Sequence, residues 1–199
     1  MTAYRQIRAT FDRDSIVVYQ AYNDLIADAA VEAQTFVAPF SLNRMTWIKP
    51  SFLWLMERSG WATKSNQTRI LAVHISRDGW ESALALGVLT AFESGLHRSV
   101  DEWRAEFQKA PVHVQWDPER SIHGKKLEHR AIQVGISRAL ISEYVSSWIR
   151  KIEDVTLLAD KVRRMRLAGK HSAARRLLPR EREYVVAAET VKRLGINAS

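Results

Sequence analysis

The chain of 199 residues contains no cysteine. Disulfide bonds, a thiolate nucleophile and cysteine-ligated zinc or iron–sulfur centres are therefore excluded. No apolar run approaches the ~20 residues that a membrane-spanning helix needs. The first residues, Met1 to Gln6, are not followed by the apolar stretch of a signal peptide. We therefore expect a cytoplasmic protein that does not contact a membrane.

Several catalytic signatures are absent as well. The sequence has no Gly-Lys-Ser/Thr phosphate loop, no Gly-x-Gly-x-x-Gly and no Gly-x-Ser-x-Gly. These absences argue against a nucleotide triphosphatase, a Rossmann dehydrogenase and a common esterase. The six histidines do not follow a metal-ligand spacing, so no metal is predicted.

Positive charge is concentrated in one segment. The net charge of +8 falls between Lys161 and Arg182, where nine cations accompany a single acid, and the rest of the chain is neutral. Such a segment favours polyanions, nucleic acid before an anionic membrane or an acidic protein, although a solvated helical face is the simpler alternative. The predicted contacts with a nucleic-acid backbone are Lys161, Arg163, Arg164, Arg166, Lys170, Arg175 and Arg176.

Hydrophobic periodicity and capping residues predict alternating strands and helices. Strands are expected at 16–21, 45–49, 70–75, 112–116 and 131–134, and helices at 24–36, 50–58, 78–92, 99–108, 136–169 and 182–194. Asp117-Pro118-Glu119-Arg120 is expected to turn. We predict a single α+β domain over 1–199 with a small sheet, an α+β core in 1–160 and a basic helical segment, 161–199, packed on it.

The most informative stretch runs from Arg44 to Trp54, because it interleaves large aromatic residues with two cations and two hydroxyls. An unpaired buried charge is expensive, and so much aromatic area is unusual on a surface. The alternative is that the aromatic residues belong to the core and the cations face solvent. We interpret the stretch as the wall of a pocket for an anionic or aromatic ligand. Its predicted ligand-binding residues are Arg44, Thr46, Trp47, Lys49, Ser51 and Trp54.

Residues near the N-terminus are candidates for the same pocket. Arg5 and Arg8 would contact phosphate at its mouth, unless they belong to a solvated arm. Tyr19 and Gln20 lie on a predicted apolar strand. A buried glutamine there needs hydrogen-bond partners, so it reads a ligand edge or satisfies a neighbouring loop.

Polar residues after the fourth predicted strand would close the other side of the pocket. Gln115 and Arg120 are predicted ligand contacts. Glu119, or alternatively Asp117, would be the carboxylate for general-base work or for stabilising an oxocarbenium ion. The simpler interpretation is a turn with ordinary surface ion pairs.

Five segments resemble the domain of unknown function 4291 (DUF4291) family: "YRQIRATFD", "VYQAYNDLIADAAV", "RMTWIKPSFLWLMERSGW", "HVQWDPER" and "LLPREREY". They span nearly the whole chain, which implies that the basic C-terminus is an integral part of the family's domain. The order of the elements is also similar to the ADP-ribosyltransferase fold, in which a small split sheet cradles NAD. That analogy concerns the fold, and the sequence lacks a clear match to the catalytic motifs of that fold. Glu57, Glu81 and Glu119 are all candidates for the catalytic glutamate that the analogy implies.

These features together predict an enzyme associated with nucleic acid, with a pocket for a nucleotide-like ligand and NAD as its possible cofactor. In a transferase, Arg44 and Lys49 would hold pyrophosphate, Trp47 or Tyr19 would stack on a ring, and Glu119 would be the acid or base. Two alternatives remain open. One is a non-catalytic module that stacks unpaired bases on Trp47 and Trp54. The other is a protein-interaction domain whose basic helices meet an acidic partner.

Overall fold

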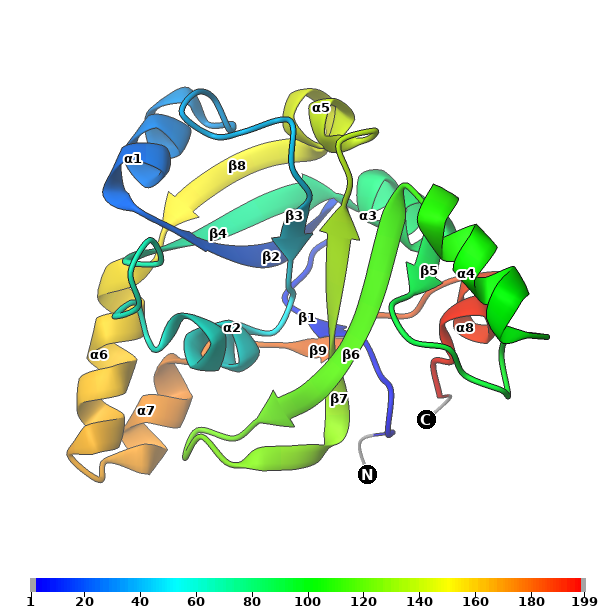
Figure 1. Ribbon diagram of the computed structural model, residues 1–199. Helices are drawn as coiled ribbons and strands as arrows, with labels where there is room; N and C mark the ends of the chain where they lie inside the picture. The colour runs from blue at the N-terminus through cyan, green and yellow to red at the C-terminus, as the bar shows by residue number, and fades with distance from the viewer. Residues whose placement is uncertain (1–2, 198–199) are drawn as a thin grey trace.

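Two sheets meet in the centre of the computed structural model, which describes residues 3–197 (Figure 1). The first sheet is antiparallel, in the order β2 (Ser15–Tyr22), β4 (Arg69–Ser76), β8 (Ile149–Asp154). The second has the order β3 (Thr46–Ile48), β7 (Lys126–Ile136), β6 (Val112–Arg120), β5 (Gly87–Leu89), with β5 parallel to β6. The Tyr19 amide donates to the Lys49 carbonyl at 2.7 Å and so joins the two sheets. The predicted α+β class is confirmed.

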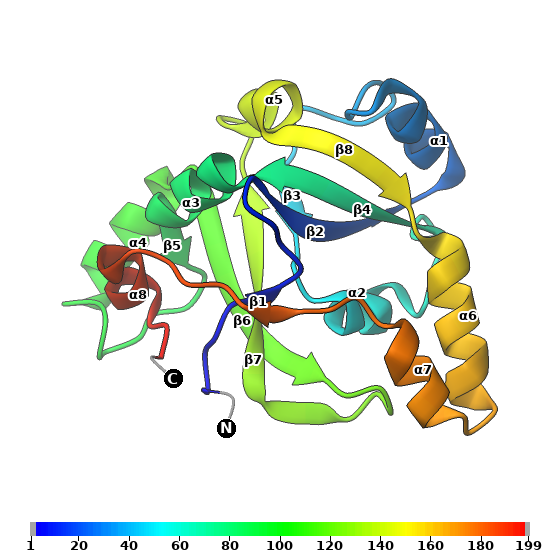
Figure 2. The same cartoon turned by 180° about the vertical axis from the view of Figure 1, so that it is seen from behind.

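A short ribbon crosses the back of the molecule. Strand β1 (Arg8–Ala9) pairs with β9 (Arg182–Glu183), which brings the two ends of the chain side by side (Figure 2). Tyr184, directly after β9, is buried in the main core. The segment after the basic helices is therefore built into the fold.

Helices surround the two sheets. They are α1 (Asp24–Ala33), α2 (Phe52–Ser59), α3 (Arg77–Ala85), α4 (Val100–Lys109), α5 (Ile141–Glu143), a π-helical turn (Tyr144–Trp148), α6 (Thr156–Leu167), α7 (His171–Leu177) and α8 (Ala188–Leu194). The Asn23 and Ser99 side chains cap α1 and α4 as predicted, and Gly195 ends α8 in the left-handed region.

Two buried clusters fix the position of the candidate site. The larger packs the two sheets around residues such as Val73, Val134 and Trp80. The smaller packs α2 and α6 against the other face of β2 and β4, through Phe52, Met56 and residues of α6 such as Val162. Helix α2 is thereby held across the gap between the sheets, directly after strand β3.

The long helix predicted over 136–169 is wrong. The chain instead makes α5, the π-helical turn, strand β8 and then α6. The predicted spacing of four residues, which includes Tyr144, Trp148 and Ile152, is also a multiple of the two-residue period of a strand, so it did not exclude β8. Pairing with β4 makes residues 149–154 a strand, because β8 hydrogen-bonds to β4 from Leu71 to Ile75.

Other boundaries also differ from the prediction. The predicted 78–92 helix ends at Ala85, is capped by Ser76 rather than Asp78, and is followed by strand β5. The turn expected after Asp117 is absent, because β6 continues to Arg120 with an irregularity after Pro118. Residues 182–187, predicted as helix, form β9 and an extended connection. Pro50 precedes the Ser51 cap of α2 instead of opening the helix.

Candidate functional site

A cavity of about 900 Å³ opens between the end of β2, the segment around β3, helix α2 and the strands β6 and β7. Its volume lies in the upper part of the range of ~300–1,000 Å³ that is typical of small-molecule sites. Trp47 and Trp54 both line it and are partly buried. The aromatic residues of the Arg44–Trp54 stretch therefore contribute to a cavity wall as well as to the core.

Lys49 supplies a buried cation to this wall. Its Nζ donates to the Trp47 carbonyl oxygen at 2.9 Å and lies 5.7 Å from the centroid of the Trp54 ring. Burial, followed by the positive charge of Arg58, lowers the pKa of Lys49 to about 7, and Asp117 acts in the opposite direction. An anion bound beside Lys49 would favour its charged form.

Two exposed arginines also line the cavity. Arg44 precedes β3, and Arg58 lies in the last turn of α2. Arg58 was not among the predicted contacts, although it follows Trp54 by four residues and so shares its helix face. Together with Lys49 these arginines give the cavity three cations.

Asp117 is the carboxylate of the cavity. Its two oxygens accept hydrogen bonds from Gln115 Nε2 at 2.9 Å and from Gln133 Nε2 at 2.7 Å. Gln115 and Gln133 face each other across β6 and β7, and all three residues line the cavity. Two amide donors therefore fix the orientation of this carboxylate.

A hydrogen-bonded network lies on the β2 side of the cavity. Gln20 Nε2 donates to Thr46 Oγ1 at 2.7 Å and to Tyr22 OH at 2.8 Å, and Tyr144 OH donates to Gln20 Oε1 at 2.6 Å. The hydrogen bonds of the Gln20 amide are thus made within the protein, which agrees with the alternative that Gln20 satisfies a neighbouring segment instead of a ligand. Gln20 and Thr46 both line the cavity and hold β3 against β2.

Glu119, the predicted catalytic residue, lies outside the lining of the cavity. It is buried near the start of α2, where Ser51 and the positive charges of Arg8 and Arg120 lower its pKa, but burial outweighs them and raises it. Glu181 lies in the same place and accepts from the Phe52 amide at 2.9 Å. Burial raises the pKa of Glu181 to about 8, and Glu119 adds to this shift. Both acids therefore pack at the start of α2 and do not face the cavity.

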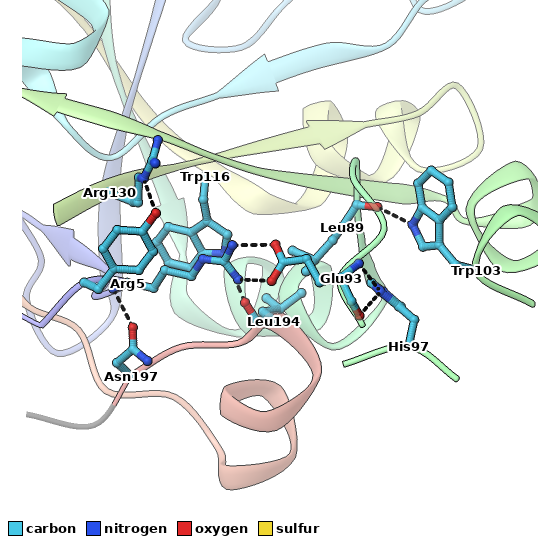
Figure 3. Close-up of polar contacts among 10 residues, drawn as sticks. Arg5, Leu89, Glu93, His97, Trp103, Trp116, Arg130, Leu194 and Asn197 are labelled. Carbon is cyan, nitrogen blue, oxygen red and sulfur yellow. Dashed lines mark hydrogen bonds and ion pairs between the residues drawn. The ribbon is translucent and has the colours of Figure 1, made fainter. Parts of the chain in front are cut away.

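The other predicted ligand contacts are engaged elsewhere. Arg5 forms two hydrogen bonds with Glu93, at 2.8 and 2.5 Å, and lies beside Trp116 (Figure 3). Arg8 donates to the Glu181 carbonyl oxygen at 2.9 Å. Tyr19 packs edge-on against Phe52, and the Arg120 guanidinium lies 3.4 Å from Glu57. Tyr19, Ser51, Arg5, Arg8 and Arg120 are absent from the lining.

The predicted nucleic-acid contacts lie on α6, α7 and the turn between them, beside α2 (Figure 1). Two of these cations have partners in the protein. Arg164 pairs with Asp160 at 3.0 Å, and the Arg166 guanidinium lies 5.1 Å from the centroid of the Trp61 ring. Arg163 is partly buried, and the fully exposed members are Lys161, Arg164, Lys170, Arg175 and Arg176.

Two kinds of feature are absent from residues 3–197. In this range no group of three or more histidine or acidic side chains is arranged to hold a metal ion. No helix in the same range combines the length and apolarity needed to cross a membrane.

Comparison with known families identifies the chain. The model of the family described as Domain of unknown function (DUF4291) matches residues 6–184. The chain belongs to the DUF4291 family. The match includes the cavity of this DUF4291 protein as well as α6, α7 and β9. Comparison with functionally curated proteins gives no match.

Proposed function

We propose that this DUF4291 protein binds a nucleotide-type ligand in its cavity and acts as a transferase associated with nucleic acid. The observation that carries the proposal is that Lys49, two partly buried indoles and an oriented carboxylate line one cavity. Arg44, Lys49 and Arg58 supply charge for a pyrophosphate, and Trp47 and Trp54 supply flat surfaces for a ring.

The transferase chemistry uses NAD as the donor. The bond between the nicotinamide nitrogen and ribose C1′ breaks, and nicotinamide leaves with the bonding electrons. An oxygen or nitrogen of the acceptor forms the new bond to C1′ and loses its proton. Asp117 is the carboxylate that lines the cavity, so it would stabilise the positive charge that develops on the ribose and accept this proton. The ADP-ribosyltransferase analogy stays a hypothesis, and detection of this reaction would support it.

The second candidate is a non-catalytic module that stacks unpaired bases on Trp47 and Trp54. The exposed cations of α6 and α7 support this candidate equally well, because they suit a polynucleotide backbone whether or not a reaction follows. The two candidates differ in their response to NAD.

Thermal unfolding with and without millimolar NAD separates them. NAD in 100-fold excess over its Kd stabilises the folded state by about 2.7 kcal/mol, so the midpoint rises if the cavity binds it. The double variant Arg44→Ala, Lys49→Ala should lose this shift. Arg13→Ala, which removes an exposed cation outside the lining of the cavity, should keep it. An unchanged midpoint for the wild-type protein would remove the NAD-dependent reaction.

Release of nicotinamide in the presence of single-stranded RNA or DNA then tests the chemistry. We expect Asp117→Asn to lower the rate by about 100-fold or more while NAD still shifts the melting midpoint. Glu119→Gln is the matched control, because Glu119 lies on the same strand but outside the cavity lining. Loss of activity in Glu119→Gln with full activity in Asp117→Asn would reverse the assignment of the carboxylate.

A further inference from the structure

A separate cluster of basic side chains lies where the β6–β7 turn meets α6 and α7. Both ribbon views bring this turn close to α7 (Figures 1 and 2). The imidazole rings of His123, in the turn, and His171, at the start of α7, lie 4.1 Å apart between centroids. Lys125 and Arg175 are exposed nearby, and their positive charges lower the pKa of His123. None of these residues lines the cavity of the candidate site.

Arg166 forms the inner part of this cluster. Its guanidinium packs over Trp61, and its Nη1 lies 3.3 Å from the point where a Cβ on Gly124 would sit. Gly124 has a φ of +81°, so a glycine both permits this turn and lets its backbone approach the arginine.

Arg166 also differs from the neighbouring arginines in its partners. Arg164 pairs with Asp160 and Arg120 with Glu57, but no described carboxylate lies within ion-pair distance of Arg166. Arg166 Nε and His171 Nδ1 are buried and have no hydrogen-bond partner among residues 3–197. Unpaired buried donors and clustered cations are unfavourable unless an anion is bound.

We infer that His123, Lys125, Arg166, His171 and Arg175 form a binding site for a backbone phosphate of single-stranded nucleic acid. The inference rests on the nucleic-acid association proposed above and narrows it to one place. Guanidinium, ammonium and imidazolium groups are donors to phosphate oxygens. Lys161, Arg164, Lys170 and Arg176 are also exposed on the same two helices and the turn between them, which suits a chain of phosphates better than a single small anion.

His123 makes binding dependent on pH. Partial loss of hydration, and then the positive charges of His171, Arg175, Lys125 and Arg166, lower the pKa of His123. On the inner side, Glu57 and Arg120 face the turn as an ion pair. A bound phosphate opposes the surrounding positive charge and raises the pKa of His123. Protons are therefore taken up on binding, and affinity increases as the pH falls.

Fluorescence anisotropy with a labelled single-stranded 20-nucleotide RNA, at constant ionic strength from pH 5.5 to 8, tests the inference. We expect the wild-type protein to bind several-fold more tightly at pH 6 than at pH 8. The double variant His123→Ala, His171→Ala should bind about tenfold more weakly at pH 6, as expected for the loss of charge-assisted contacts, and its affinity should no longer depend on pH. Thermal unfolding checks that the variant is folded, and His123→Gln, His171→Gln repeats the test with polar side chains.

Arg164→Gln is the matched control. It removes one positive charge from α6, but Arg164 already has an acid partner, so it should keep the pH dependence and most of the affinity. Wild-type affinity and pH profile in both histidine double variants would overturn the inference while leaving the proposed nucleic-acid association intact. Absence of RNA binding by the wild-type protein at every pH would overturn both. Tighter binding to phosphatidylserine vesicles than to RNA would also overturn the phosphate site on nucleic acid.

Discussion

At the scale of single residues, Lys49 makes the cavity unusual. A buried ammonium group destabilises the fold, and here its hydrogen bond goes to the Trp47 carbonyl oxygen instead of a carboxylate. A buried ammonium group lowers the stability of the free protein, and such a group is typical of a site that binds an anion. Anion affinity should therefore fall as the pH rises above 7, because free Lys49 then loses its proton.

Replacing Lys49 separates stability from binding. Lys49→Met should raise the free energy of unfolding by about 1–4 kcal/mol at pH 6 and abolish the stabilisation by NAD. The unfolded lysine has a pKa of 10.5 and the native one about 7. Between these values the unfolded wild-type chain binds more protons, so wild-type stability rises with pH and the advantage of the variant shrinks towards pH 10.

Urea unfolding at pH 6, 8 and 10 measures this trend. Lys126→Met, which removes an exposed lysine from β7, is the control and should change stability by no more than about 0.5 kcal/mol at any pH. A Lys49→Met protein that is less stable than wild type at pH 6 would contradict the account of Lys49 as a buried cation.

At the scale of elements, the start of α2 depends on a distant part of the chain. Ser51 caps the helix by accepting from the Trp54 amide at 3.1 Å, and Glu181, next to β9, accepts from the Phe52 amide. Two amides of the first turn are thus satisfied, one locally and one by tertiary structure. Because α2 carries Trp54 and Arg58, Glu181 supports the wall of the cavity without lining it.

Neutralising Glu181 should stabilise α2 at alkaline pH. The native pKa is about 8 and the ordinary value is 4.5, so the native state binds more protons between these values. The stability contributed by this group is present below pH 4.5 and is lost as the pH rises through 8. Glu181→Gln keeps an acceptor for the Phe52 amide and carries no charge.

We therefore expect Glu181→Gln to melt a few degrees above wild type at pH 9 and close to it at pH 5, since about 1 kcal/mol corresponds to roughly 2–4 °C in a protein of this size. Differential scanning calorimetry at both pH values measures the effect. Glu128→Gln changes an exposed acid of β7 and should produce no such pH-dependent difference. An equal gain at pH 5 and pH 9 would show that charge is not the cause.

At the scale of the whole molecule, the two chain ends close the fold. Besides the β1–β9 pair, the Arg5 amide donates to Asn197 Oδ1 at 2.8 Å, and Trp116 Nε1 donates to the Leu194 carbonyl oxygen at 3.0 Å (Figure 3). Tyr184 and Leu194 are buried in the main core. The basic helices α6 and α7 are therefore followed in the chain by segments that pack into the main core.

A chain that ends at Leu177 should fail to fold cooperatively. It loses Tyr184 and Leu194 from the core, at about 1.5–3 kcal/mol each, and also the partner of β1, against a total stability of about 5–15 kcal/mol. Circular dichroism during heating, together with binding of a hydrophobic dye, measures this loss. Arg180→Ala, an exposed change in the removed segment, should melt like wild type. A sharp transition in the shortened chain would show that the C-terminal segment is dispensable.

Local patterns predicted the elements whose causes lie within a few residues. Asn23, Ser99 and Gly195 bound the helices where capping chemistry requires them, and the apolar run Ile70–Ile75 marks β4. The Arg44–Trp54 stretch was identified as a pocket wall because its cations and indoles are contiguous in sequence. Strands β1, β5, β8 and β9 were missed, because each is stabilised by pairing with a distant strand.

The sequence by itself determined the α+β class, the family and the residues of one wall of the cavity. Only the tertiary structure decided which carboxylate faces that wall. Asp117 and Glu119 lie two residues apart on β6, and both are acids beside polar neighbours. Gln133 orients Asp117 in the cavity, whereas the start of α2 covers Glu119. A sequence signal describes neighbours along the chain, but burial and hydrogen-bond partners come from segments that folding brings together.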